Sequence, residues 1–459
     1  MTIETTATTD AGDGSTAARD AVPGVPGGPT SSGVPGGPGA DWAGARAEAA
    51  VRDAARAAAR VRARVAAAVA GPAARLDARR LPPWAQALLV YGVSRFFVTW
   101  VAQRCADMAA PHPGGRHWNY LEIANNWDGT WYERISVEGY PAHLPHDRAG
   151  AVAQNTWAFY PLFPNVVHTV ERSLGIGWTL AATIVSLTCA LVTAVVVRSL
   201  VARVAGPRAG LWTVALLFFF PSSLVLQLPY SEGLGLLLLV GVLWCLQRGR
   251  YLAATPLILL VGVARPLGVP LAAVLGVHLL ARAWDVRAEP RLRAARSLAG
   301  PLVAAAAGAV AAVEWPLIVW WGTGVRSGYT RTMAAWRSTR TIVPVEPSIE
   351  VSRTFLGQQT GPLLVWAAVG GVVLWLLLRG RRAIGLDLTV WCLAYSVYLL
   401  IVLDSFTSLP RYLLPLFPLG TLLLSTSRSR AFRIALTVSF AMFGVVWTIG
   451  VWRSHTWAP

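Results

Sequence analysis

Residues 178–197 read WTLAATIVSLTCALVTAVVV and contain no charged side chain. A helix of about 20 residues is about 30 Å long, which matches the hydrocarbon core of a bilayer. This stretch therefore predicts a membrane-spanning helix.

Apolar runs of this kind follow one another from Trp84 almost to the end of the chain. They predict eleven spans, at residues 84–103, 178–200, 209–228, 232–248, 251–265, 266–281, 298–321, 361–378, 385–403, 411–426 and 433–452. Between the fifth and sixth, Arg265-Pro266 is also compatible with a broken or re-entrant helix. We expect an all-α polytopic membrane protein with about eleven transmembrane helices.

The composition agrees with a membrane protein. Hydrophobic residues make up 54% of the 459 residues and charged residues only 14%, whereas soluble domains carry about 25% charged residues. The formal charge of +17 comes from 40 basic residues, all arginine, against 23 acidic ones. These arginines lie mostly in short links and form no stripe interleaved with aromatics, so we expect no nucleic-acid partner.

The arginine clusters predict the orientation of the spans. They precede the first span and follow the even-numbered ones: Arg75, Arg79 and Arg80; Arg198, Arg203 and Arg208; Arg248 and Arg250; Arg282, Arg287, Arg291, Arg293 and Arg296; Arg379, Arg381 and Arg382; Arg428, Arg430 and Arg433. With eleven spans, all fall on one side, which is the cytoplasmic side by the positive-inside rule. The N-terminus is then cytoplasmic, and the long segments 104–177 and 322–360 are extracytoplasmic. The first of these outer loops is rich in aromatics and should carry interfacial helices.

Residues 1–83 are expected to form a cytoplasmic tail, and residues 84–459 the transmembrane domain. Residues 1–40 are mostly Gly, Pro, Ser, Thr and Ala, a composition typical of disorder. Residues 41–80 are rich in Ala and Arg, with arginine at every fourth position from Arg52 to Arg64. That basic stripe is either solvated or attracted to anionic lipid head groups.

The first outer loop contains a short predicted helix. Trp127, Trp131 and Ile135 are spaced as one apolar face, with Asn126 as the expected N-cap and Gly139 at the end. Its tryptophans favour a position at the membrane surface.

Asp128 falls in the first turn of this helix, where the helix dipole favours an ionised carboxylate. Such a group suits a general base that takes a proton from an acceptor hydroxyl. Alternatively, it only complements the dipole of a structural helix.

Several motifs occur in an order that resembles the PIG-V family, the second mannosyltransferase of glycosylphosphatidylinositol assembly and its bacterial relatives. They are the loop Trp127–Tyr140, the aromatic-proline run 159–164, the Pro-Ser run 220–223, Pro-Tyr-Ser-Glu-Gly at 229–233, Ala-Arg-Pro-Leu-Gly at 264–268, and Pro-Arg-Tyr at 410–412. The resemblance covers about residues 84–425. Leu267 departs from it, because eukaryotic relatives more often carry Asn there, so this part of the site is expected to differ.

The resemblance implies a GT-C glycosyltransferase, most closely a mannosyltransferase or other hexosyltransferase, in the cell membrane. Such an enzyme moves a sugar from a polyprenyl-phosphate donor to an extracytoplasmic lipid or glycan acceptor, with inversion. We expect no cofactor. Asp128 would be the catalytic base. The substrate-binding residues would be Trp127, Tyr132, Tyr230, Glu232, Arg265, Arg411 and Arg95.

The chemistry of these residue types supports that assignment. Arginine suits a departing phosphate because its planar fork can bond two oxygens and stays charged. Arg95, Arg265 and Arg411 are therefore phosphate candidates, although each is also compatible with snorkelling or a structural ion pair. Glu232, with Ser231 as expected N-cap, is either a first-turn cap or a site residue.

Other polar residues are less informative. The histidines His112, His117, His143, His146 and His168 lie in or just after the first outer loop, with no helix face to present them together, so no metal site is expected. Glu314 either lines a groove or is a buried, hydrogen-bonded acid. The four cysteines are expected to be packing residues.

Two other functions remain open at this stage: a transporter or flippase of lipid-linked sugars, and a non-catalytic membrane scaffold. A transporter would favour internal repeats with paired broken helices, and no convincing repeat is visible in the sequence.

Overall fold

A computed structural model describes residues 56, 60, 81–108, 119–337, 343, 345–403 and 408–454. The chain divides into two compact units, residues 1–77 and 78–459. In the first unit only Arg56 and Arg60 are described, both helical and exposed. The rest of the predicted tail, including Arg52 and Arg64, lies outside the described residues.

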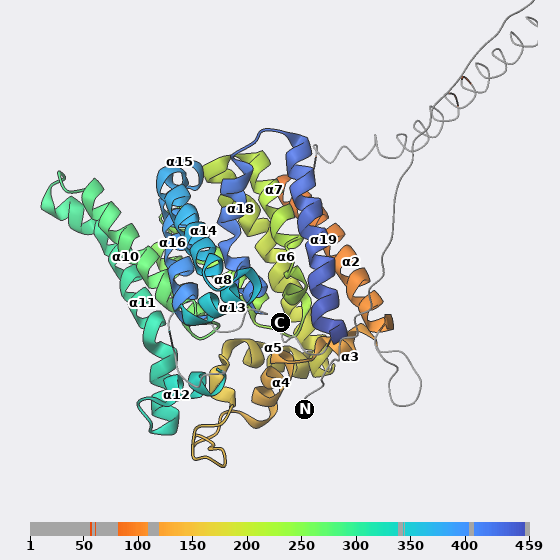
Figure 1. Cartoon of the computed structure of the whole chain (residues 1–459). Coiled ribbons are helices and arrows are strands. Elements are labelled where there is room, and N and C mark those ends of the chain that lie inside the picture. The colour runs from red at the N-terminus through yellow and green to blue at the C-terminus, as the bar shows by residue number, and fades with distance from the viewer. Residues whose placement is uncertain are drawn as a thin grey trace, which may run out of the picture. The chain divides into compact units, whose positions relative to one another are not determined.

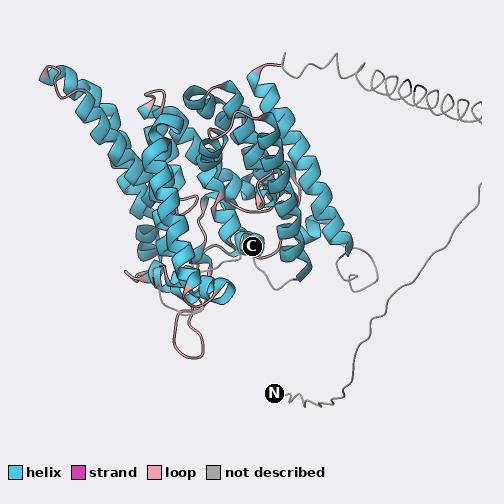
Figure 2. Ribbon diagram, turned by 45° about the horizontal axis from the view of Figure 1, so that its top comes forward, coloured by secondary structure: helices cyan, strands magenta, loops and turns pink. Residues whose placement is uncertain are grey.

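The second unit is a bundle of helices (Figure 1), and helices are the regular elements of its described part (Figure 2). The α-helices are α2 (Pro83–Met108), α3 (Tyr120–Ala124), α4 (Asp128–Glu138), α5 (Leu162–Leu174), α6 (Trp178–Ala205), α7 (Pro207–Phe218), α8 (Glu232–Leu246), α9 (Tyr251–Gly262), α10 (Gly268–Asp285), α11 (Arg291–Thr323), α12 (Gly328–Ala335), α13 (Glu346–Leu356), α14 (Thr360–Trp375), α15 (Arg381–Ile384), α16 (Leu386–Val402), α17 (Leu409–Tyr412), α18 (Phe417–Leu424) and α19 (Arg430–Ser454). Short 3₁₀ or π segments are η1 (Thr156–Ala158), η2 (Ser223–Gln227), η3 (Leu376–Gly380) and η4 (Leu414–Leu416).

The all-α polytopic membrane architecture predicted from the sequence is confirmed. Each of the eleven predicted spans carries at least one helix. In the described part of the chain, five helices are long and apolar enough to cross a bilayer: α2, α6, α11, the helical run Thr360–Ile384 and α19. Shorter apolar helices, such as α8 and α16, complete the bundle.

Two predicted spans are not continuous helices. The run 209–228 is α7 followed by η2, and the run 411–426 divides into α17, η4 and α18. Proline explains both breaks, because it lacks a backbone N–H and clashes with the preceding turn: Pro221 follows α7, and Pro415 lies in η4. The run 251–281 is α9 and α10, joined by a turn that contains Arg265 and Pro266.

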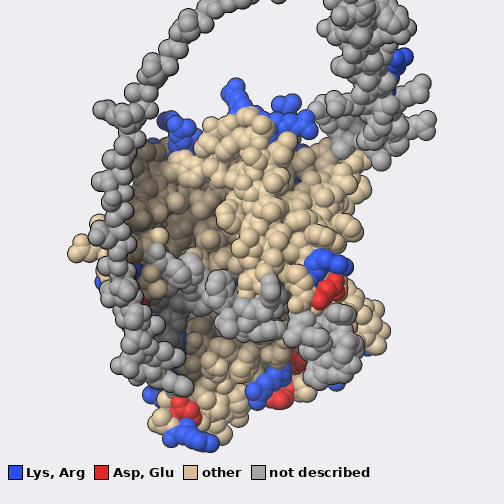
Figure 3. Space-filling view, turned by 45° about the vertical axis from the view of Figure 1, so that its right-hand side comes forward, with Lys and Arg blue, Asp and Glu red and all other residues tan. Residues whose placement is uncertain are grey.

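The two ends of the bundle differ in charge. The α6–α7, α10–α11 and α18–α19 connections and α15, all rich in arginine, lie at one end, and α3, α4, α5 and α12 lie at the other (Figure 1). On the visible part of the face in Figure 3, arginines gather along one edge and mixed charges near the opposite edge, with an uncharged band between them. This band is what a bilayer requires of the surface it covers.

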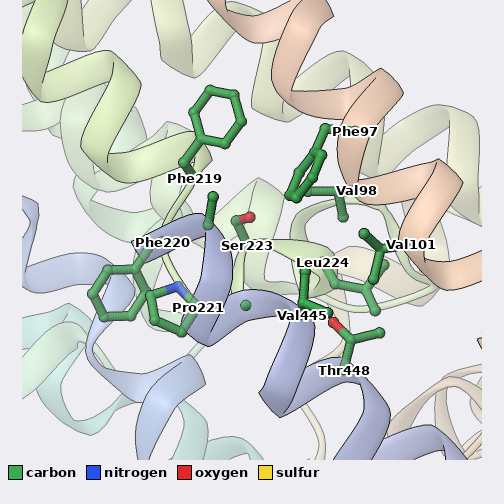
Figure 4. Close-up of a pocket in the computed structure, with 12 residues that line it drawn as sticks. Phe97, Val98, Val101, Phe219, Phe220, Pro221, Ser223, Leu224, Val445 and Thr448 are labelled. Carbon is green, nitrogen blue, oxygen red and sulfur yellow. The ribbon is translucent and has the colours of Figure 1, made fainter. Parts of the chain in front are cut away.

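Helix α19 closes the bundle against α2. Phe97 and Val101 of α2 face Val445 and Thr448 of α19 across the segment that follows α7 (Figure 4). The gap between them is only about 10 Å³ and largely apolar, so it is a packing defect between spans.

Candidate active site

Asp128 is the first residue of α4, as the sequence predicts, but the cap is different. The N-cap is Trp127, with φ 52° and ψ −113°, whereas the side chain of Asn126 donates to the Ile123 carbonyl at 3.1 Å. The predicted Asn126 cap is therefore wrong, because that amide is used by the preceding turn. A bulky residue at positive φ is a backbone outlier, and such strain often marks functional positions.

The helix ends where the sequence predicts, with the Gly139 N–H donating to the Ile135 carbonyl at 2.9 Å. The apolar face is shifted from the predicted one: Gly129, Tyr132 and Ile135 are buried. Trp131 is half-buried and packs on aromatic rings of neighbouring segments. The face turns because the helix packs on η1 and α5 as well as on the bundle.

The carboxylate of Asp128 forms an ion pair with Arg411 of α17, a residue 283 positions later in the chain. The Nη2 atom of Arg411 also donates to the hydroxyl of Tyr412 at 3.3 Å. Burial raises the pKa of Asp128 above its ordinary value, the Arg411 guanidinium opposes that rise, and the nearby Glu232 carboxylate adds to it. Asp128 thus lies in a setting that makes it a stronger base than an exposed aspartate.

A second pair lies beside the first. Glu232, at the start of α8, has its Oε1 atom 2.8 Å from Nη1 of Arg265 and 3.6 Å from Nη1 of Arg411. These two contacts of Glu232 are ion pairs without hydrogen bonds, since neither of its carboxylate oxygens accepts a hydrogen bond from a described residue. The four side chains therefore form a chain of alternating charge that sums to zero.

Among these four charged side chains, that of Asp128 is the most exposed to solvent. Its side chain is 21% exposed, against 5% for Glu232, 8% for Arg411 and 11% for Arg265. An entering ligand can therefore reach the carboxylate of Asp128 more easily than that of Glu232.

Ser231 connects these charges to α4. Its hydroxyl lies 2.6 Å from the Tyr132 hydroxyl and accepts from Nη1 of Arg265 at 3.0 Å. Ser231 occupies the predicted N-cap position of α8, but its side chain makes no cap hydrogen bond because these two partners occupy it. The neighbouring Tyr230 donates from its hydroxyl to the Asn126 carbonyl at 3.1 Å, which ties α8 to the strained turn before Asp128.

Two glycines make room for Arg265. A Cβ atom at Gly235 would lie 2.5 Å from Cδ of Arg265, so the first turns of α8 can accept this side chain only with glycine there. A Cβ atom at Gly268 would lie 2.1 Å from the Ala311 carbonyl oxygen, so the α9–α10 turn approaches α11 closely. Both contacts fix where the guanidinium can point.

The motif segments that are far apart in the sequence meet around this cluster. The Ser222 hydroxyl donates to the Pro410 carbonyl at 2.7 Å, and the Leu162 N–H donates to the Val263 carbonyl at 3.1 Å. The ring of Tyr132 packs edge-on against Phe159, with centroids 5.3 Å apart. Each motif thus contacts another, and together they surround one site.

The structure brings together six of the eight predicted site residues and leaves one clearly elsewhere. Asp128, Tyr132, Tyr230, Glu232, Arg265 and Arg411 lie in the cluster, and Trp127 forms the turn that leads into it. Arg95 on α2 instead donates to the carbonyls of Phe218 and Ser223 at 2.7 and 2.8 Å and to Gln227 Oε1 at 3.1 Å. It fastens η2, the segment that precedes Tyr230 and Glu232.

Some site residues were not selected from the sequence. Tyr412 was part of a motif but not a site candidate, yet the guanidinium carbons of Arg411 and Arg265 lie 5.1 and 5.8 Å from its ring centre. Arg337, which follows α12, lines a cavity that also contains Arg265. The length of the second outer segment was the only signal for Arg337 in the sequence.

The remaining polar residues are less involved. All four cysteines are buried and free, which confirms the packing prediction. Oε1 of Glu314 is buried and accepts no hydrogen bond from a described residue, so this oxygen does not fit a hydrogen-bonded acid. In the described part of the chain no three His, Cys, Asp or Glu residues are grouped to hold a metal. His112 and His117 lie outside that part.

No protein-family model matches this sequence, and no curated protein is significantly similar to it. Among solved structures, the chain is similar to ArnT from Cupriavidus metallidurans bound to undecaprenyl phosphate. The identity is 17% and the TM-score 0.42, over 79% of this chain and 74% of ArnT. It is also similar to the Archaeoglobus fulgidus oligosaccharyltransferase in complex with Zn and sulfate, at 12% identity and a TM-score of 0.43, over 78% of this chain. The match spans 53% of that chain, about half its length.

Proposed function

We propose that this protein is a membrane glycosyltransferase that moves a hexose from a polyprenyl-phosphate donor to a hydroxyl of a lipid or glycan acceptor, on the extracytoplasmic side and with inversion. The motif resemblance favours mannose as the sugar. The observation that supports the proposal most directly is the pairing of Asp128 with Arg411, beside Glu232 and Arg265, at the end of the bundle opposite the arginine-rich connections.

Asp128 has the properties of the general base. It is the most accessible carboxylate of the cluster, and burial raises its pKa, which strengthens it as a proton acceptor. In the reaction, Asp128 takes the proton of the acceptor hydroxyl as that oxygen attacks the anomeric carbon. The bond from this carbon to the phosphate oxygen breaks, and the lipid phosphate leaves with the electron pair.

Arg411 orients this base and places positive charge near the breaking bond. Its Nε atom is buried without a partner among the described residues, so one donor remains for substrate. Glu232 has two carboxylate oxygens without hydrogen bonds, which suits acceptance of hydrogen bonds from sugar hydroxyls. Tyr132 and Tyr230 hold α4 and α8 together around the sugar.

The location of the cluster suits a substrate that is part lipid. The helices that carry Asp128 lie at one end of the uncharged band, where water and bilayer meet. A donor with an isoprenoid tail can remain in the bilayer while its phosphate and sugar reach this level. A nucleotide sugar has no isoprenoid tail that could remain in the bilayer beside the apolar surface.

Turnover by the purified full-length chain tests this function. With labelled polyprenyl-phosphate mannose and a mixture of membrane lipids as acceptors, we expect a labelled glycolipid of inverted anomeric configuration. Polyprenyl-phosphate glucose tests the choice of hexose, and a nucleotide mannose tests the donor class. Transfer from the nucleotide sugar alone would contradict the proposal. Movement of the lipid-linked sugar across vesicles without transfer would instead identify a transporter.

A further inference from the structure

A cavity of about 220 Å³ lies beside the charged cluster, between the α9–α10 turn, α11, α12 and the end of α16. Ligand pockets commonly measure about 300–1,000 Å³, so this cavity has the size for a small head group rather than a long glycan. One of its walls is Arg265, the partner of Glu232. The side chain of Arg265 therefore borders both the cavity and the charged cluster.

Arg337 also lines the cavity and has an unused donor. The residue is only 7% exposed, and Nη2 donates to the Val402 carbonyl. Its Nη1 atom is buried and has no hydrogen-bond partner among the described residues. An unpartnered buried donor of a charged group is costly, so a ligand that accepts from it would be bound with a large gain.

The charged side chains that line the cavity are basic. Among the described residues that line it, Arg265 and Arg337 are basic and none is acidic. Glu232 already balances Arg265, so the excess charge belongs to Arg337. A phosphate group fits this excess, because the guanidinium fork can bond two of its oxygens.

Aromatic side chains form much of the remaining wall. The hydroxyls of Tyr160 and Tyr329 lie 3.1 Å apart, and Trp315 packs on Tyr160 with ring centres 5.3 Å apart. Tyr398 also lines the cavity. Flat rings with hydroxyl groups provide both apolar surface and hydrogen bonds for a sugar.

We propose that this cavity binds the phosphate-bearing head group of a lipid substrate, with the phosphate between Arg337 and Arg265 and the attached sugar against the tyrosines. The proposal rests on the proposed function for its choice of substrate, the sugar-phosphate end of the donor. Arg337 is then the residue that selects a phosphate lipid over a neutral one. The sugar carbon bonded to that phosphate lies toward Glu232 and Asp128.

The selection of phosphate can be measured without turnover. The purified full-length chain is titrated with a polyprenyl monophosphate and with the corresponding polyprenol, which lacks the phosphate. We expect the parent chain to prefer the phosphate at least about tenfold, and Arg337→Gln to lose about tenfold of the phosphate affinity while its polyprenol affinity is unchanged. Arg331→Gln, which changes an exposed arginine of α12, the helix that precedes Arg337, is the matched control and should retain the parental preference. A parental preference in Arg337→Gln would overturn the proposal.

A second pair of variants serves if Arg337→Gln does not fold. Met333 also lines the cavity, so Met333→Glu puts a negative charge beside the expected phosphate and Met333→Gln is its neutral counterpart. We expect Met333→Glu to abolish the phosphate preference and Met333→Gln to keep it. Equal preference in both variants would overturn the proposal.

Kinetics decide which substrate carries the phosphate. With the donor and a phosphate-bearing acceptor, Arg337→Gln should raise the donor KM at least about tenfold and leave the acceptor KM unchanged. A rise in the acceptor KM alone would overturn the donor assignment. If the chain transfers no sugar at all, the proposed function fails but the binding measurements still test the cavity. If it transfers sugar and Arg337→Gln is indistinguishable from the parent chain, only the cavity proposal fails.

Discussion

Two buried arginines in this molecule have opposite surroundings. Arg95 is 6% exposed and Arg411 is 7% exposed, so both are withdrawn from solvent to the same extent. Arg95 is surrounded by neutral acceptors, two backbone carbonyls and the amide of Gln227. Arg411 is surrounded by the carboxylates of Asp128 and Glu232, and its Nε atom has no partner among the described residues.

The difference separates a cation among neutral acceptors from one paired with carboxylates. Neutral carbonyls cannot change charge, so the surroundings of Arg95 stay the same at every pH and in every step of a reaction. The surroundings of Arg411 change when Asp128 gains a proton, and its unused donor can bind a ligand. Burial alone therefore does not identify a site residue, whereas the kind of partner does.

The largest expected effect is that of Asp128→Asn. Asparagine keeps the size and much of the hydrogen bonding but cannot take the proton, so kcat should fall about 10²–10⁴-fold with donor affinity roughly retained. The measurement is steady-state turnover of the lipid-linked sugar. Glu138→Gln is the control, because Glu138 ends the same helix and, among the described residues, its ion pair is with Arg134 at an exposed position. Near-parental turnover by folded Asp128→Asn would remove the catalytic role and weaken the contrast with Arg95.

Arg95→Gln should affect stability rather than catalysis. The change removes charged donors from buried acceptors, which costs on the order of 3 kcal/mol of unfolding free energy. Thermal unfolding in detergent should show a lower Tm, while kcat per folded molecule stays within about twofold. A stable variant with a raised donor KM would instead place Arg95 in the substrate site.

Arg411→Lys should have an intermediate effect. Lysine retains the charge but loses the planar fork that contacts both Asp128 and Tyr412. The kcat/KM for the donor should therefore fall roughly 5–30-fold, which corresponds to about 1–2 kcal/mol of activation free energy. Arg433→Lys, near the opposite end of the bundle, is the matched control. Unchanged donor kinetics in Arg411→Lys would mean that charge alone is sufficient at this position.

The smallest effect should appear in the pH profile. Because burial and Glu232 raise the pKa of Asp128 while Arg411 and Arg265 lower it, the rate should decline on acidification at a pH above the ordinary aspartate value of about 3.9. Glu232→Gln removes a negative neighbour, so the acidic limb of kcat/KM should move to lower pH. A limb that does not move would show that another group controls it.

The sequence predicted the helices better than the contacts between them. The lengths of the apolar runs are local properties, so all eleven ranges carry helices, and prolines account for the two breaks, in 209–228 and 411–426, that were not anticipated. The pairing of Asp128 with Arg411 depends on how distant spans pack. Motif order placed both residues on one list of candidates, but it could not separate them from Arg95.

The cavity at Arg337 could not be predicted for the same reason. Its walls come from five separate parts of the chain, and Arg337 resembles any other arginine in an outer segment. The cap of α4 was predicted wrongly because asparagine is one of the residues preferred at a helix N-cap. In the structure, the Asn126 side-chain amide instead donates to the Ile123 carbonyl in the preceding turn.

The distance of 283 residues between Asp128 and Arg411 has a consequence for biosynthesis. At about 5–20 residues per second, a ribosome needs on the order of 15–60 seconds to make Arg411 after Asp128 has emerged. During that time the ribosome adds Glu232 and Arg265 of the same cluster. Arg411 is still missing. A chain that stops before Arg411 therefore never acquires this counter-ion of Asp128. Charge neutrality in this cluster is thus reached only once Arg411 has been made.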